Sequence, residues 1–315
     1  MTYCRNILDL IGNTPLVEIS EFSPNPSVRI LMKMEGQNPG GSVKDRVALA
    51  MVEDAEKAGV LSNNATLLEP SSGNTGIALA MISRVKGYHL KVVMPQNVSE
   101  ERRQMLLAFG AEIIESPGSE GSNGAVRMAE KIHAEHPDWV FLYQYANHAN
   151  PMAHYEGTGP EIWRDCPDVT HFVAGLGTSG TLVGVGKFLK ERNPNIQVWA
   201  VEPPAGELVD GLRSLEDGYI PPIFNDFNGP QLLDRKTVIG PRESIEWTKR
   251  LADSGILAGI SSGSALAGAV RCASSIESGV IVIVSADGGW KYLSTGVWTE
   301  DIDVVAERAR TMVYF

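Results

Sequence analysis

The fold of this chain is decided by the stretch Thr170-His171-Phe172-Val173-Ala174-Gly175-Leu176-Gly177-Thr178-Ser179-Gly180-Thr181. Its first five residues form a mostly apolar run that predicts a buried strand, and the glycines that follow predict a tight turn. The residues after this turn are typical of a helix. A buried strand that passes through a glycine turn into a helix is the repeating unit of a parallel sheet.

The same order of strand, turn and helix recurs along the chain. Strands are also predicted at 16–19, 28–34, 66–69, 90–94, 112–115, 196–201 and 280–285. Helical crossovers force mostly parallel sheets, and ligands gather beyond the carboxyl ends of the strands. The sequence therefore predicts an α/β protein with mostly parallel twisted sheets. Its strand–helix units form two sets, at about 43–142 and 151–285, with the active cleft between them.

Composition argues against several classes of function. The chain has 315 residues and a formal net charge of -11, which repels nucleic acids and anionic lipid surfaces. No stretch approaches the ~20 apolar residues of a membrane helix, and the first residues lack the pattern of a signal peptide, so we expect a cytoplasmic protein. The cysteines are far apart and lack C-x-x-C spacing, which predicts reduced thiols and no metal site. They are Cys4, Cys166 and Cys272.

A lysine is placed at a predicted helix start in the segment Asn38-Pro39-Gly40-Gly41-Ser42-Val43-Lys44-Asp45-Arg46. Ser42 and Asp45 have the spacing of a capping box, which puts Lys44 in the first helical turn. The positive end of the helix dipole lowers the pKa of an ammonium group there and favours its use as an amine nucleophile. From this segment alone, a solvated lysine is an equally good interpretation.

Three further segments each lead into a predicted helix, and the first two follow predicted strands. Glu69-Pro70-Ser71-Ser72-Gly73-Asn74-Thr75-Gly76 can form an anion cradle of carboxylate size, or an ordinary capped glycine turn. The loop at 177–181 offers amides and hydroxyls to one phosphate, and it lacks the spacing of a dinucleotide or P-loop motif. In Gly259-Ile260-Ser261-Ser262-Gly263-Ser264, a serine hydroxyl can serve as a neutral partner of a pyridine nitrogen or as a helix cap.

These segments, in this order, resemble the fold-type II pyridoxal-phosphate (PLP) enzymes, and more narrowly the cysteine synthase (O-acetylserine sulfhydrylase) family. The opening Ile11-Gly12-Asn13-Thr14-Pro15-Leu16-Val17 and the segment Lys291-Tyr292-Leu293-Ser294-Thr295-Gly296 also look like family signatures, so the resemblance covers nearly the whole chain. It implies the two-lobed architecture of the tryptophan synthase β type. A larger lobe (1–40 and 149–315) would bind the cofactor phosphate, and a smaller mobile lobe (41–148) would carry the lysine and the carboxylate loop.

The resemblance also implies site residues. It assigns the Schiff-base lysine to Lys44, the contact with the 3′-oxygen of PLP to Asn74, and the contact with the pyridine nitrogen to Ser261. It assigns the phosphate to Gly177, Thr178, Ser179, Gly180 and Thr181, and the substrate carboxylate to Ser71, Ser72, Asn74, Thr75 and Gln144. Ser71 departs from the threonine usual in the family. The run at 100–104 (EERRQ) is expected to be a solvated helix face.

The implied reaction is β-replacement on O-acetyl-L-serine, or O-phospho-L-serine, by a sulfur nucleophile to give L-cysteine. Gly211-Leu212-Arg213-Ser214 makes the chain most similar to the cysteine synthase B type, in which Arg213 would face the cleft and bind an anionic substrate. The alternative for Arg213 is a surface pair with Glu216 or Asp217. The resemblance further implies a homodimer and allows a sulfur-carrier protein as partner. Rival functions are a cystathionine β-synthase, a serine or threonine dehydratase, and a non-catalytic PLP-binding scaffold.

Overall fold

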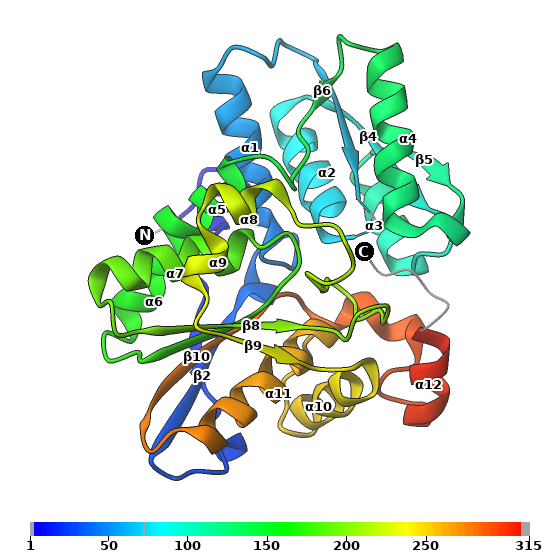
Figure 1. Cartoon of the computed structure of the whole chain (residues 1–315). Helices are drawn as coiled ribbons and strands as arrows, with labels where there is room; N and C mark the ends of the chain where they lie inside the picture. The colour runs from blue at the N-terminus through cyan, green and yellow to red at the C-terminus, as the bar shows by residue number, and fades with distance from the viewer. Residues whose placement is uncertain (1–2, 72, 310–315) are drawn as a thin grey trace.

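The computed structural model describes residues 3–71 and 73–309. Its larger sheet has six strands in the order β1-β2-β10-β7-β8-β9, all parallel except for the antiparallel pair β1 and β2. Their bounds are β1 Leu16–Glu18, β2 Val28–Met34, β7 His171–Gly175, β8 Gln197–Glu202, β9 Arg235–Val238 and β10 Gly279–Ser285. Because β2 pairs with β10, segments from the early and late parts of the chain lie side by side in this sheet (Figure 1).

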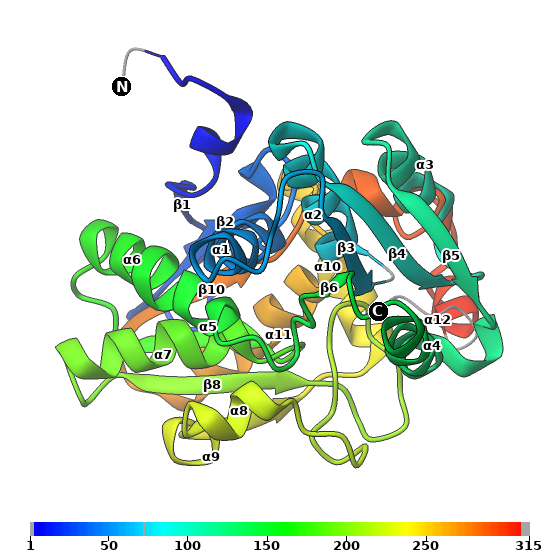
Figure 2. The same ribbon diagram turned by 90° about the horizontal axis from the view of Figure 1, so that it is seen from above.

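The smaller sheet has four parallel strands in the order β5-β4-β3-β6. They are β3 Thr66–Pro70, β4 His89–Pro95, β5 Glu112–Ser116 and β6 Val140–Phe141. Both sheets are built from strand–helix units, so the predicted α/β class with mostly parallel sheets is confirmed. The first described residues, with η1 (Ile7–Leu10), extend away from the rest of the chain beside β1 (Figure 2).

Helices connect the strands and cover the sheets. The α-helices are α1 Lys44–Lys57, α2 Asn74–Lys86, α3 Glu100–Ala108, α4 Gly121–Glu135, α5 Ala149–Ala153, α6 Gly159–Asp165, α7 Gly180–Arg192, α8 Pro222–Asp226, α9 Gly229–Leu232, α10 Pro241–Asp253, α11 Ile260–Ser275 and α12 Ile302–Ala309. A π-helical turn, η5 (His154–Thr158), joins α5 to α6, and short 3-10 helices lie at Ser20–Phe22 (η2), Glu35–Gln37 (η3), Gly118–Glu120 (η4) and Gly289–Thr295 (η6).

The larger sheet is buried on both faces because its central strands are apolar on both sides. On β10, Ile281 and Ile283 belong to a cluster with residues of α10 and α11, while Val282 and Val284 belong to a cluster with residues of α7. A strand covered by helices on both faces has no polar alternation. The predicted strands lie within one residue of the observed ones at nearly every boundary, whereas β6 and β9 were not predicted. β6 has only two residues, and β9 reads Arg-Lys-Thr-Val with only Thr237 buried.

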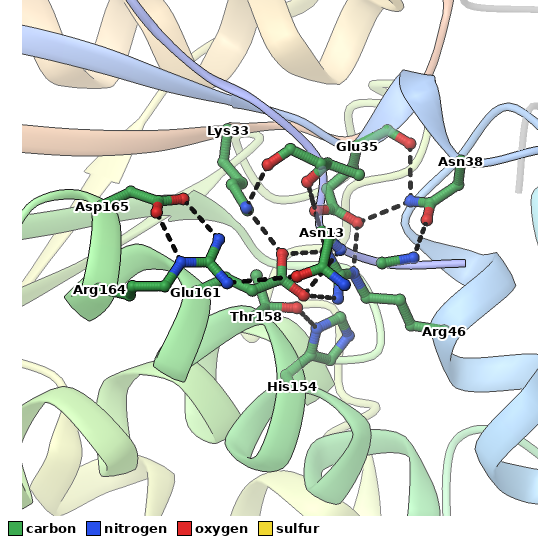
Figure 3. A network of polar contacts seen from close by, with 12 residues as sticks. Asn13, Lys33, Glu35, Asn38, Arg46, His154, Thr158, Glu161, Arg164 and Asp165 are labelled. Atoms are coloured by element: carbon green, nitrogen blue, oxygen red, sulfur yellow. Dashed lines mark hydrogen bonds and ion pairs between the residues drawn. The ribbon is translucent and has the colours of Figure 1, made fainter. Parts of the chain in front are cut away.

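A network of buried charges joins the start of α1 to the larger sheet and to α6 (Figure 3). Arg46 donates to Glu35 at 2.7 Å and to Glu161 at 2.6 Å, and Lys33 pairs with Glu161 at 2.7 Å. Glu35 also accepts a hydrogen bond from the hydroxyl of Thr14 at 2.6 Å. Two cations face two carboxylates, so every charge has a partner inside the protein. The segment that carries Lys44 is therefore held from both sides.

Two other features bear on the class of protein. In the part of the chain that the structure describes, no helix is long and apolar enough to cross a membrane, and no group of three or more His, Cys, Asp or Glu side chains is arranged to hold a metal ion. The cysteines are free thiols. Burial, with the neighbouring Asp168, raises the pKa of Cys166 to about 12, and burial raises that of Cys272 to about 12, so neither thiol is a nucleophile near neutral pH.

Candidate active site

Two adjoining cavities, of ≈ 100 Å³ and ≈ 50 Å³, lie where β3 and β7 end. The larger one is lined by the segment after β3 and the smaller one by the loop after β7. Lys44 and Ser261 line both. The site therefore lies on the loops at the carboxyl ends of parallel strands, where such a fold places its ligands.

Lys44 is the first residue of α1, but the capping box that placed it there is not formed. Val43 is the N-cap and is itself helical, and no side-chain cap is made. The carboxylate of Asp45 instead accepts the backbone N–H of Gly40, five residues back. Burial lowers the pKa of the Lys44 amine, while the negative charge of Asp287 raises it. The predicted lowering of the Lys44 pKa is therefore present, but its cause is burial and not the helix dipole. A lowered pKa favours the neutral amine that acts as a nucleophile.

The predicted carboxylate cradle lies at the start of α2 and lines the larger cavity. The hydroxyl oxygen of Ser71 accepts the backbone N–H of Gly73 at 3.3 Å and of Gly76 at 3.0 Å, which shapes the turn. The hydroxyl of Thr75 donates to Oε1 of Gln144 at 2.7 Å. Ser71, Asn74, Thr75 and Gln144 all line this cavity, whereas Ser72 lies outside the described residues.

Glu69, which the sequence did not single out, positions the glutamine of this cradle. Its carboxylate accepts the backbone N–H groups of Tyr143 at 2.8 Å and Gln144 at 3.2 Å. Complete burial raises the pKa of Glu69 to about 8, and these hydrogen bonds act in the opposite direction. A carboxyl group buried at the end of β3 thus fixes the loop that carries Gln144 against α2.

The predicted phosphate loop, residues 177–181, lines the smaller cavity and leads into the N-terminus of α7. The two glycines of the loop leave no room for a side chain. A Cβ atom on Gly177 would lie 2.6 Å from the carbonyl oxygen of Gly211, and one on Gly180 would lie 1.9 Å from Oδ1 of Asn150. Ser179 has a left-handed backbone, and its buried hydroxyl has no hydrogen-bond partner among the described residues. Backbone amides at a helix N-terminus and an unsatisfied hydroxyl fit a phosphate group.

The remaining hydroxyls of this loop are held by side chains outside it. The hydroxyl oxygen of Thr178 accepts a hydrogen bond from Nδ2 of Asn150 at 3.0 Å, and the hydroxyl of Thr181 lies 3.1 Å from Nε2 of His154. Burial lowers the pKa of His154 well below its usual value, with further lowering by the charges of Arg46 and Lys44, so its ring is neutral. The loop is therefore preorganised by neutral partners that leave its positive helix end available to an anion.

Arg102 corrects the expectation for the run at 100–104. This side chain is not solvated but 1% exposed, and it lines the larger cavity from α3. Its Nη2 lies 2.6 Å from Oδ2 of Asp210, on the loop after β8, and its guanidinium lies 5.0 Å from the ring centre of Tyr292. Burial raises the pKa of Asp210 to about 6, although the charge of Arg102 lowers it. This ion pair connects the two sheets beside the cavity.

Arg213 lies in the wall of the larger cavity. Its guanidinium is 4.8 Å from the ring centre of Tyr219 and 5.2 Å from that of Tyr145. Of the two acidic residues in the alternative, Glu216 lies 3.6 Å from the amine of Lys236, while Asp217 accepts the backbone N–H of Gly206 and lines a second pocket together with Arg213. The geometry thus places the predicted specificity residue at the cavity.

Comparisons with known proteins agree with this geometry. Residues 7–287 match the family described as "Pyridoxal-phosphate dependent enzyme". A cysteine synthase B of Pseudomonas aeruginosa is 42% identical over 93% of this chain and 97% of its own length. Among solved structures, an O-ureido-L-serine synthase superposes with a TM-score of 0.88 at 35% identity, over 96% of this chain and 98% of its own. A cysteine synthase of Entamoeba histolytica gives a TM-score of 0.87 at 33% identity, over 98% of this chain and 96% of its own.

Proposed function

This chain belongs to the pyridoxal-phosphate-dependent enzyme family, and we propose that it is a cysteine synthase that works through Lys44. One observation carries the proposal. The partly buried Lys44 lines both a cavity that ends on the predicted phosphate-binding loop and a cavity that ends on the predicted carboxylate cradle. An amine between two anion sites suits a cofactor with one phosphate and an amino-acid substrate with one carboxylate.

The residues present fit PLP. The loop at 177–181 would hold the phosphate, because it offers amides at a helix N-terminus and the unsatisfied hydroxyl of Ser179. Ser261, at the start of α11, would face the pyridine nitrogen, and Asn74 would contact the 3′-oxygen. When bound, PLP withdraws electrons from the substrate and makes its Cα–H bond acidic.

The chain's own residues supply the rest of the mechanism. The cradle of Ser71, Thr75 and Gln144 would orient the substrate by its carboxylate. Nζ of Lys44, freed when the substrate amine takes its place, would remove the proton from Cα. The Cβ–O bond then breaks and acetate leaves with the electron pair. A sulfide adds at Cβ to form the C–S bond, and the proton returns to Cα, so that L-cysteine is released.

The products formed with O-acetylserine test this proposal. The protein loaded with PLP should convert O-acetyl-L-serine and sulfide to equal amounts of L-cysteine and acetate, measured by chromatography and an acetate assay. Pyruvate in place of cysteine would show a dehydratase, and no turnover of either kind would show a scaffold. Both results would contradict the proposal.

The wider setting of the enzyme is also proposed. Residues 1–40 with 149–315 would form the larger lobe, and 41–148 a smaller lobe that closes over the substrate and keeps water away. We propose that the protein is cytoplasmic and forms a homodimer. The dimer is supported by the extended N-terminal segment, which exposes apolar side chains, among them Tyr3 (77% exposed) and Leu10 (50% exposed). A sulfur-carrier protein remains a candidate donor.

Arg213 is proposed to recognise an anionic group on the substrate or on the sulfur donor. Contact with two tyrosine rings restricts where its guanidinium can lie, and a guanidinium can bind a phosphate or thiosulfate through two parallel hydrogen bonds. O-phospho-L-serine and thiosulfate are therefore candidate substrates beside O-acetyl-L-serine and sulfide.

Replacing Arg213 by alanine should separate these substrates. We expect kcat/KM for O-phosphoserine or for thiosulfate to fall by at least ~10-fold, about 1.4 kcal/mol, with little change for O-acetylserine and sulfide. Arg235→Ala is the matched control, because Arg235 stacks on Trp199 at 4.7 Å and lines neither cavity. An equal loss for all substrates, or no loss for any, would contradict the role in specificity.

A further inference from the structure

A second lysine lies behind the site, where it contacts the residue proposed to touch the cofactor ring. Lys291, on η6, is fully buried and lines neither cavity. Its Nζ donates to Oδ1 of Asn74 at 2.7 Å. On the other side of the same amide, Nδ2 of Asn74 donates to Oδ2 of Asp287 at 2.8 Å. The side-chain amide of Asn74 is thus held at both ends.

The chemistry of the two neighbours allows only one orientation of this amide. A lysine ammonium can only donate hydrogen bonds, and a carboxylate can only accept them. If the amide were turned over, its NH₂ group would face the lysine and its oxygen would face the carboxylate, and both contacts would be repulsive. Asp287 is held as an acceptor, because the hydroxyl of Tyr292 donates to the same Oδ2 atom at 2.7 Å.

We propose that Lys291 is a positioning residue that fixes the orientation of the Asn74 side-chain amide. One N–H of Nδ2 then donates to Asp287, and the other N–H, not the carbonyl oxygen, is available to the cavity that Asn74 lines. This inference rests on the proposed function, in which Asn74 contacts the 3′-oxygen of PLP. An anionic oxygen there needs a donor and is repelled by a carbonyl oxygen. Lys291 thus acts on the cofactor through Asn74 and does not touch it.

The surroundings of Lys291 keep it in this role. Burial lowers the pKa of its amine to about 8, although the charges of Asp287, Asp45 and Asp210 raise it and only Arg102 adds to the lowering. At pH values below about 8 the amine is therefore mainly an ammonium, which can only donate.

Lys291→Met removes the donor and keeps most of the side-chain volume. In this variant the Kd for PLP, measured by titration of the apoprotein, should rise by about 10-fold, as expected for one lost hydrogen bond to a buried polar group. The visible absorption band of the bound cofactor should also shift, because its 3′-oxygen loses an oriented donor. Lys291→Arg, which also only donates, should restore most of both properties.

Lys249→Met is the matched control and should leave the Kd and the spectrum unchanged. Lys249 likewise donates one hydrogen bond, to the backbone oxygen of Glu300 at 2.8 Å, and lines neither cavity. If the methionine variant of Lys291 does not fold, Lys291→Leu serves instead, because it too removes the donor to Asn74. Wild-type affinity and spectrum in whichever variant folds would overturn the inference. A wild-type protein that binds no PLP would overturn the proposed function and the inference together.

Discussion

Replacing Lys44 by alanine is expected to lower kcat/KM for cysteine formation by at least ~10⁴-fold, about 5.5 kcal/mol of transition-state stabilisation. The loss is large because one amine is proposed to hold the cofactor and to move the proton at the substrate Cα. PLP should still bind through the loop at 177–181, but more weakly, since the covalent bond is gone. Cysteine release under saturating substrates, together with a PLP titration, separates the two effects.

The site of covalent attachment gives an independent check. Borohydride reduction of the wild-type protein should fix the cofactor on the peptide that contains Lys44, as read by mass spectrometry. Two other buried lysines, Lys33 and Lys291, serve as internal controls, because each has an oxygen partner within 2.7 Å in the structure. Label on either of them would show that the wrong lysine has been assigned.

Arg46→Met is expected to lower the free energy of unfolding by about 3–5 kcal/mol, measured by urea denaturation of the apoprotein. Methionine roughly preserves the volume of the side chain and removes its charge, which leaves Glu35 and Glu161 buried without their shared cation. Arg164→Ala is the control. Arg164 pairs with Asp165 at the surface, 57% and 30% exposed, and should cost within about 0.5 kcal/mol. A loss equally small for Arg46 would show that its carboxylate partners need no cation.

The same network of buried charges makes the stability of the fold depend on pH in the acid range. Burial acts to raise the pKa of Glu161, but hydrogen bonds and charge from Arg46, and a hydrogen bond from Lys33, lower it to about 2. Because the folded-state pKa lies below the unfolded value of about 4.3, this stability is present above pH ~4.3 and is lost as the pH falls toward 2.

The sequence predicted the parts of this structure that depend on local pattern. Continuous apolar runs such as 280–284 marked the buried strands, and glycine-rich loops after strands marked the anion sites, because both signals lie within about ten residues. The start of α1 was placed correctly for a reason that proved wrong. Asp45 has the spacing of a capping box, but the tight turn at Gly40 offers its carboxylate a nearer N–H group.

The side chains that the sequence did not single out are those whose role depends on a distant partner. Arg102 looked like a member of a charged helix face, but it is buried and paired with Asp210, which lies on the loop after β8. Lys291 belongs to a segment that looked like a family signature, yet its contact with Asn74 joins residues far apart in the chain. Pairings of this kind are set by tertiary packing, for which a single sequence carries no local signal.

The pairing of β2 with β10 orders events during synthesis of the chain. All four strands of the smaller sheet lie between residues 66 and 141 and leave the ribosome long before Gly279–Ser285. Until then β2 has only the short strand β1 along one edge, and its other edge lacks its native partner. An apolar strand with an open edge is a template for pairing with other chains. In the nascent protein β2, like β7, is therefore open to such pairing until β10 has been made.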